Sequence, residues 1–262
     1  MEYAIELSNV SLVRDGTPIL EDISIKIAKG ESVAVIGPNG SGKTSLMKIL
    51  KGDARPYYDE TKRITCRMFG KERWNIFDLR KKLGVVSGDL QSRFNDSAAV
   101  GAVILSGFFR TMDVYKDHEI TDEMITAAEK AAERVGIYDK MTRDYGKLSL
   151  GEMRRTLIAR ALVPGPEMLL LDEPMTGLDI VIKAQFRDMF DSLIDKGTNV
   201  VMITHELEDI PKNVERVIMM KDGKIFRDGK KKDVLTSDIV SSLFSSPIKV
   251  TEDNGTYRMV ML

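Results

Sequence analysis

The sequence lacks several features that would assign it to a specialised class of protein. Its one cysteine, Cys66, excludes an internal disulfide. Its 39 basic residues are balanced by 40 acidic ones, so it shows no basic excess of the kind that nonspecific nucleic-acid binding needs. The apolar stretch 98–109 is shorter than the about 20 residues of a membrane span, and no signal-peptide pattern opens the chain. We therefore expect a cytosolic chain with no nucleic-acid partner and no membrane span of its own.

Strand and helix patterns alternate along the chain. Residues 32–37 form a nearly continuous apolar run, which is typical of a strand buried on both faces of a parallel sheet. Thr121 and Gly136 are the expected cap and end of a helix, and Asn254-Gly255 predicts a hairpin turn. Further strands are expected at 4–13, 22–31, 64–70, 81–88, 168–173, 199–205, 217–223 and 224–229, and helices at 41–52, 119–136, 147–162 and 181–197.

The order of these elements predicts a single α/β domain that spans residues 1–262. Residues 1–92 and 148–245 are expected to form the core, with a mostly parallel sheet and an N-terminal antiparallel β subdomain. A helical subdomain at 93–147 is inserted into this core, and a C-terminal β-hairpin at 246–262 follows it.

The stretch "GPNGSGKT" matches the phosphate-binding pattern G-x-x-x-x-G-K-[ST] in full. It follows an apolar strand and opens a helix, so we expect a P-loop NTPase core. Glycines let backbone N–H groups close around phosphate oxygens, and the helix N-terminus adds a positive dipole. Lys43 is expected to reach the β- and γ-phosphates, and the Thr44 hydroxyl to bind Mg²⁺. The candidate nucleotide-binding residues here are Gly37, Pro38, Asn39, Gly40, Ser41, Gly42, Lys43, Thr44 and Ser45.

Two later strands end in side chains that could complete a catalytic site. "MLLLDEP" delivers Asp172 to the carboxyl end of a buried strand, where ligands bind in open α/β sheets. Asp172 is expected to hold Mg²⁺ and Glu173 to act as general base on an attacking water. "VVMITHE" ends in His205, which could donate a hydrogen bond to the γ-phosphate.

The stretch "KLSLGEMRRTLIARAL" has the pattern of a capped amphipathic helix, because Glu152 follows Ser149 at capping-box spacing. Gly151 in its first turn needs a reason, since glycine costs about 1 kcal/mol against alanine in a helix.

These motifs in this order resemble an ATP-binding cassette (ABC) ATPase. The motifs are "GPNGSGKT", "LSLGE", "LLLDEP", "TGLD" and "MITH". The resemblance implies that two cassettes sandwich two ATP molecules head to tail, with Mg²⁺ as the other cofactor. Ser149 and Gly151 then contact ATP held by the partner cassette, and Asp179 links the two sites.

The sequence departs from the family pattern at three places. Leu150 replaces the first glycine of the signature. Arg14 stands where the family carries an aromatic residue that stacks on adenine, and a guanidinium can also stack there. Gly88 stands where the family's glutamine ends a strand, so Gln91 is the expected metal-site residue, with Asp89 as its alternative.

The resemblance implies an energy-coupling ATPase of a membrane transporter, similar to molybdate-type or iron-complex-type importers. Its partners are a second cassette, identical or paralogous, and separate transmembrane permease chains, so it is expected at the inner face of the membrane. The permease would enter a groove for which the candidate residues are Phe94, Phe108 and Phe109. The alternatives are a soluble cassette, as in iron–sulfur assembly, and a nonhydrolysing nucleotide sensor, which the presence of Glu173 and His205 disfavours.

Overall fold

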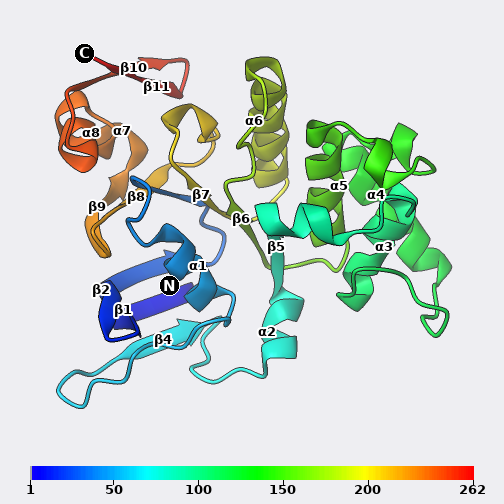
Figure 1. Ribbon diagram of the computed structural model, residues 1–262, viewed down its shortest axis with the longest axis horizontal. Coiled ribbons are helices and arrows are strands. Elements are labelled where there is room, and N and C mark those ends of the chain that lie inside the picture. Colours follow the sequence, from blue (N-terminus) through cyan, green and yellow to red (C-terminus); the bar gives the residue numbers. More distant parts are fainter. Residues whose placement is uncertain (1) are drawn as a thin grey trace.

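A six-stranded sheet crosses the computed structural model, which describes residues 2–262 (Figure 1). Its strand order is β5-β6-β7-β3-β8-β9. The first five strands are parallel, and β9 joins the edge antiparallel to β8. Their bounds are β3 Val33–Ile36, β5 Leu83–Ser87, β6 Met168–Asp172, β7 Val200–Thr204, β8 Arg216–Lys221 and β9 Lys224–Lys230. The mostly parallel α/β sheet expected from the apolar runs is confirmed.

Alternate residues of the central strands enter different cores, because successive side chains of a strand point to opposite faces. Leu169 and Leu171 of β6 pack with α5 and α6, whereas Met168 and Leu170 pack with α1 on the other face. The helices of the core are α1 Lys43–Leu50, α2 Ile76–Lys82, α5 Leu150–Leu162, α6 Ile180–Asp195, α7 Lys231–Val234 and α8 Ser237–Phe244. Helix α2 occupies the start of the expected strand 81–88, so β5 begins later.

The predicted N-terminal antiparallel subdomain is a sheet of order β2-β1-β4, with bounds β1 Tyr3–Arg14, β2 Thr17–Ala28 and β4 Thr65–Met68. Strand β2 starts five residues before the expected 22–31 and ends three residues earlier. The reason is a two-residue turn at Asp15 and Gly16, both with positive φ, which pairs Arg14 with Thr17.

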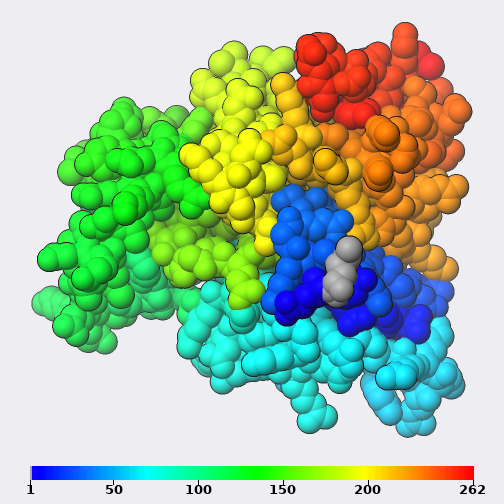
Figure 2. All heavy atoms as spheres, turned by 180° about the vertical axis from the view of Figure 1, so that it is seen from behind, coloured from blue at the N-terminus to red at the C-terminus, as the bar shows by residue number. Residues whose placement is uncertain are grey.

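The inserted region is helical, with η1 Gly88–Arg93, α3 Val100–Phe109, α4 Asp122–Val135, η2 Tyr138–Lys140 and η3 Tyr145–Lys147. Thr121 caps α4 and Gly136 ends it, as predicted. Helix α5 packs against α3 and α4, and together they form one end of the molecule (Figures 1 and 2). The division at 93–147 therefore stays a prediction, because α5 adjoins both parts.

The predicted C-terminal hairpin is confirmed as β10 Ile248–Asp253 and β11 Thr256–Met261. It packs beside η4 Leu207–Asp209, which follows β7 (Figure 1). No helix within residues 2–262 combines the length and apolar character needed to cross a bilayer.

Candidate active site

The carboxyl ends of four parallel strands meet at one edge of the sheet. The register pairs Ser87 of β5 with Asp172 of β6, and Asp172 with Ile203 of β7. It also pairs Ile36 of β3 with Thr204. The phosphate loop, Asp172 and Glu173, and His205 all follow these strand ends, so the topology brings the three predicted motifs together.

The phosphate loop closes tightly between β3 and α1. A side chain at Gly37 would collide with the carbonyl oxygen of Met220, so only glycine can occupy that position. Gly40 and Gly42 have φ of 81° and 100°, which L side chains rarely adopt. No side chain caps α1, and the buried hydroxyl of Ser41 has no hydrogen-bond partner within residues 2–262. The helix start and the Ser41 hydroxyl therefore keep free hydrogen-bond donors, as an anion site requires.

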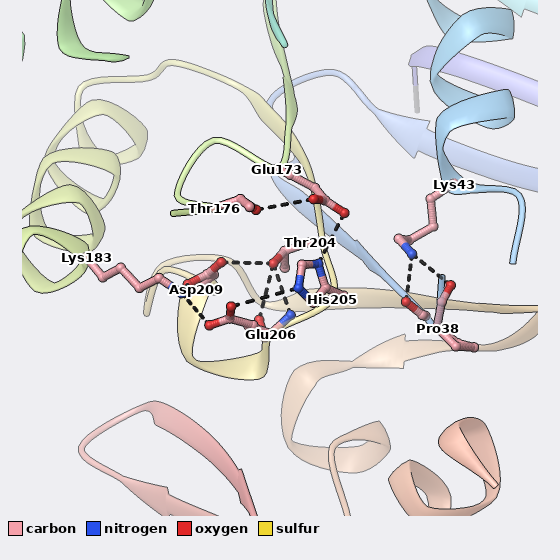
Figure 3. Close-up of polar contacts among 10 residues, drawn as sticks. Pro38, Lys43, Glu173, Thr176, Lys183, Thr204, His205, Glu206 and Asp209 are labelled. Atoms are coloured by element: carbon pink, nitrogen blue, oxygen red, sulfur yellow. Dashed lines mark hydrogen bonds and ion pairs between the residues drawn. The ribbon is translucent and has the colours of Figure 1, made fainter. Parts of the chain in front are cut away.

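Lys43 is folded back onto its own loop (Figure 3). Its Nζ donates to the carbonyl oxygens of Gly37 at 2.7 Å and Pro38 at 3.0 Å, and the residue is only 5% exposed. Burial lowers the pKa of Lys43, and the nearby carboxylates of Glu173 and Asp172 oppose this shift. The ammonium is therefore held at the loop, within electrostatic reach of the two acidic residues.

Asp172 and Glu173 stand side by side but in different environments. Burial raises the pKa of Asp172, and so does Glu173, while Lys51 and Lys43 oppose the rise. Glu173 has a φ of 49°, a left-handed conformation that costs a non-glycine residue about 1–2 kcal/mol. Its N–H donates to the carbonyl of Ile203 at 2.9 Å, which ties this strained turn to β7.

His205 is bonded to Glu173. Its Nδ1 lies 3.1 Å from Glu173 Oε1, and Thr176 donates to Glu173 Oε2 at 3.2 Å (Figure 3). Both Glu173 and His205 remain about one-third exposed, so water and ligand can reach them. A carboxylate held between a hydroxyl and an imidazole can accept a proton from a water, which is the chemistry expected of a general base.

The two candidates for the glutamine position point in different directions. The Gln91 amide donates to Met153 Sδ of α5 at 3.3 Å. Asp89 instead accepts from the Ser87 hydroxyl at 2.6 Å, which lowers its pKa, and it acts electrostatically on Asp172. Asp89 therefore acts on Asp172, the expected Mg²⁺ ligand, whereas the Gln91 side chain is bonded to α5.

The space beside Gly88 is taken by a cation from α5. The guanidinium of Arg154 lies 3.6 Å from where a side chain at Gly88 would begin. Arg154 is buried, and its Nε and Nη1 have no hydrogen-bond partner within the described residues. A glutamine at position 88 would compete with this guanidinium for the same volume.

Two N–H groups at the start of α5, those of Ser149 and Glu152, find partners within the same chain. Ser149 and Glu152 form the predicted capping box, with Glu152 Oε2 2.8 Å from the Ser149 N–H. Gly151 is buried against α6, and a side chain there would meet Ile182 Cγ2 at 3.1 Å. Packing therefore explains part of the need for glycine. Ser149 itself is exposed, and its helix α5 lies apart from α1, the helix that follows the phosphate loop (Figure 1).

Two further predicted contacts lie at the surface. Asp179 caps α6 by accepting from the N–H groups of Val181 and Ile182. Arg14 ends β1 with its side chain 79% exposed, near only Asp15 among charged partners in residues 2–262. Both side chains are accessible to a ligand or a second chain.

Comparison with known proteins decides the family. The family model described as "ABC transporter" matches residues 20–176. The chain belongs to the ABC transporter ATPase family. It is therefore an ATP-binding, ATP-hydrolysing enzyme, and the resemblance read from its motifs is confirmed.

Relatives of this ABC ATPase cover nearly its whole length. The uncharacterized ABC transporter ATP-binding protein YlmA of Bacillus subtilis is 34% identical over 94% of this chain and 92% of its own. The hemin import ATP-binding protein HmuV of Escherichia coli O157:H7 is 31% identical, with 98% of each chain covered. The structure of cbiO1 from Clostridium perfringens, part of the ABC transporter complex cbiONQ, matches with a TM-score of 0.79 at 26% identity, covering 92% of this chain and 94% of that chain.

The donors at the sheet edge of this ABC ATPase suit Mg²⁺. Thr44 and Asp172 offer hard oxygen ligands, and the raised pKa of Asp172 reflects buried negative charge that a cation would offset. Within residues 2–262 no cluster of three or more His, Cys, Asp or Glu could hold a metal alone. Mg²⁺ commonly binds one or two protein oxygens together with substrate phosphates, so two ligands are sufficient.

A polar network beside His205 was not predicted from the sequence. Glu206 follows the histidine, and its carboxylate pairs with Lys183 of α6, which also reaches buried Asp209. The sequence signals for this network were Glu206, directly after His205, and Lys183, one helical turn after Asp179. Neither shows from spacing that the two meet.

Proposed function

We propose that this ATPase acts as a head-to-tail dimer of cassettes that powers a transporter whose membrane-spanning part lies on separate chains. It would work at the inner face of the membrane, as a peripheral subunit. The observation that carries the dimer is the separation of two half-sites in one chain. The phosphate loop, Asp172 and Glu173 gather at the sheet edge, while the exposed cap Ser149 opens a helix in another part of the molecule (Figure 1).

In this proposal each residue at the carboxyl ends of the parallel strands has one role. Lys43 leaves the loop carbonyls for the β- and γ-phosphates. Thr44 and Asp172 would hold Mg²⁺, which would neutralise phosphate charge. Glu173 takes the proton of the attacking water, and His205 orients Glu173 by donating a hydrogen bond from Nδ1 to its carboxylate. The first-turn N–H groups of the partner's α5 complete the anion site.

The import direction is supported by relatives with named transport roles. HmuV is named for hemin import, and the zinc uptake protein ZurA of Listeria innocua is 32% identical over 86% of each chain. Two cargoes as different as hemin and zinc occur among cassettes of comparable similarity. We therefore assign the choice of cargo to the membrane chains rather than to this subunit.

A cationic cavity supports the proposed contact with the membrane chains. It has a volume of about 290 Å³ and lies between β5, the 88–93 segment and α3. Its basic lining outnumbers the acidic one and consists of Lys51, Arg80, Arg93, Arg110 and Arg160 against Asp53 and Asp89. An acidic helix of a permease would be complementary to it. Phe94, Phe108 and Phe109 do not line this cavity; Phe94 is buried beneath Arg160.

The catalytic assignment is tested with Glu173→Gln. The variant keeps the size of the side chain and a hydrogen-bond acceptor, but it loses basicity. We expect ATP binding to persist, turnover to fall roughly 100-fold or more, and an ATP-dependent dimer to accumulate in size-exclusion chromatography. Near-normal turnover would remove Glu173 from the role of base.

The membrane partnership is tested with charge reversal in the cavity. Arg93→Glu should abolish co-purification with the proposed permease from detergent-solubilised membranes while sparing ATPase activity of the isolated subunit. Lys116→Glu, a charge change on the exposed loop after α3, is the matched control. Equal co-purification of all three proteins would contradict the docking site, and the absence of any membrane partner would favour the soluble alternative.

A further inference from the structure

The imidazole of His205 lies between two carboxylates (Figure 3). Its Nδ1 is 3.1 Å from Glu173 Oε1, while its Nε2 is 3.8 Å from Glu206 Oε1. Only the first distance permits a hydrogen bond. The ring is thus hydrogen-bonded to Glu173 but not to Glu206, although both carboxylates lie beside it.

Lys183 holds that second acid. It comes from the first turn of α6, its side chain is 13% exposed, and its Nζ pairs with Glu206 Oε2 and lies 3.3 Å from Asp209 Oδ1. It is the only lysine or arginine within ion-pair distance of either acid in the part of the chain that the structure describes. Burial works against the charge of Lys183, but the two carboxylates outweigh it and raise its pKa. The lysine is therefore a fixed cation.

Asp209 gives Lys183 a second, purely structural partner. Asp209 is 1% exposed, burial raises its pKa, and the Thr204 hydroxyl donates to its Oδ2 at 3.0 Å. Any test of Lys183 must therefore separate an effect through Glu206 from the cost of leaving Asp209 buried without a cation.

We propose that Lys183 is a positioning residue that sets the tautomer of His205 by restraining Glu206. A neutral imidazole has one N–H, and two carboxylates compete for it. Pairing with Lys183 keeps Glu206 away from Nε2, so the proton stays on Nδ1 and the ring stays bonded to Glu173. This inference rests on the proposed roles of Glu173 and His205.

Loss of the lysine would reverse this preference. Glu206 would need to move only about 1 Å to bring its oxygen within hydrogen-bond distance of Nε2. The proton would then reside on Nε2, and Glu173 would lose the donor that orients it. Since a misplacement of about 1 Å at a reacting group can cost on the order of 100-fold in rate, we expect turnover to fall by about 10-fold or more.

The test uses the full chain in an Asp209→Asn background, where no buried carboxylate is left unpaired. Adding Lys183→Met should lower kcat about 10-fold with the KM for ATP within about twofold, because the lysine touches no nucleotide. Adding Glu206→Gln as well should restore kcat, because no carboxylate then competes for the ring. Lys183→Arg should retain kcat. Thermal melting of each protein checks that it is folded.

A spectroscopic readout reports the tautomer directly. The chain has only two histidines, so ¹⁵N imidazole shifts of His205 can be assigned with a His118→Gln variant. In the pH range where the ring is neutral, Nδ1 should carry the proton in the background protein and Nε2 in its Lys183→Met derivative.

Four outcomes decide between the proposed function and this inference. An unchanged kcat and tautomer in the Lys183→Met derivative overturns the positioning role, and so does a loss that Glu206→Gln fails to restore. His205→Ala is measured in parallel. If it turns over ATP normally, the proposed role of His205 fails together with this inference, whereas a slow His205→Ala beside a normal Lys183→Met derivative refutes the inference alone.

Discussion

Gly151→Ala separates the two explanations for the glycine at the start of α5. If the glycine serves only packing against α6, the methyl group has a cost and a benefit within the monomer. Alanine gains about 1 kcal/mol of helix propensity over glycine. The new Cβ lies 3.1 Å from Ile182 Cγ2, so the isoleucine must shift by a few tenths of an ångström. A comparable rotamer strain costs about 0.5–1.5 kcal/mol.

These two contributions nearly cancel. The net change in unfolding free energy is expected within about 1 kcal/mol, which shifts Tm by no more than about 4 °C for a chain of this size. ATP binding by the monomer should also be unchanged, because the start of α5 is apart from its own phosphate loop (Figure 1).

The effect on turnover should be much larger. If phosphate of ATP bound to the partner cassette approaches the N–H groups at Gly151, these donors must keep their place. The methyl group presses on Ile182 within its own chain, so it displaces the N–H groups rather than removing them. Since a misplacement of about 1 Å at a reacting group can cost on the order of 100-fold in rate, we expect steady-state ATPase activity to fall about 10-fold while Tm and the calorimetric affinity of the monomer hold.

Ile182→Ala is the matched control, because it removes Cγ2 from the same packing contact without changing α5. It should leave ATPase activity near normal. Wild-type turnover in Gly151→Ala would refute the close approach of phosphate, and loss of ATP binding by the monomer would show that the helix acts within its own chain.

Three further predictions follow. Lys43→Ala should raise the Kd for ATP in calorimetry by roughly 10- to 100-fold, the equivalent of one charged hydrogen bond of about 1.5–3 kcal/mol, and an unchanged Kd would contradict the assignment. Arg154→Met should raise Tm, because it removes a buried guanidinium whose Nε and Nη1 lack partners within residues 2–262, whereas a fall in Tm would reveal partners for it. Arg14→Ala should weaken ATP by about 1 kcal/mol and Arg14→Tyr restore it, as expected for stacking on adenine; equal affinities would make residue 14 a bystander.

The motifs with strict local geometry could be predicted from the sequence. "GPNGSGKT" specifies its own loop, because the glycines and the following helix are needed wherever the phosphates bind. The continuous apolar runs before Asp172 and His205 likewise specify buried parallel strands. Since such strands align their carboxyl ends, the meeting of these residues at one edge follows from the pattern.

The remaining details depend on packing that spacing does not encode. Nothing local tells that Gln91 turns toward Met153, that Arg154 lies beside Gly88, or that Lys183 meets Glu206 across 23 positions. The sequence does not predict the short helices α7 and α8, because each is brief and its burial depends on packing against β8, β9 and β10. Predicting the family required the whole set of motifs, because many NTPase families share the phosphate loop.

The position of Lys43 has a consequence for the thermodynamics of nucleotide binding. Its side chain is immobilised by the carbonyls of Gly37 and Pro38 before any ligand arrives, so about 1.5–2 kcal/mol of rotamer entropy is lost during folding and not during association. When ATP binds, phosphate oxygens then replace these carbonyl oxygens as hydrogen-bond acceptors of the Lys43 ammonium group. The enthalpy gained at this residue is the difference between phosphate and carbonyl partners.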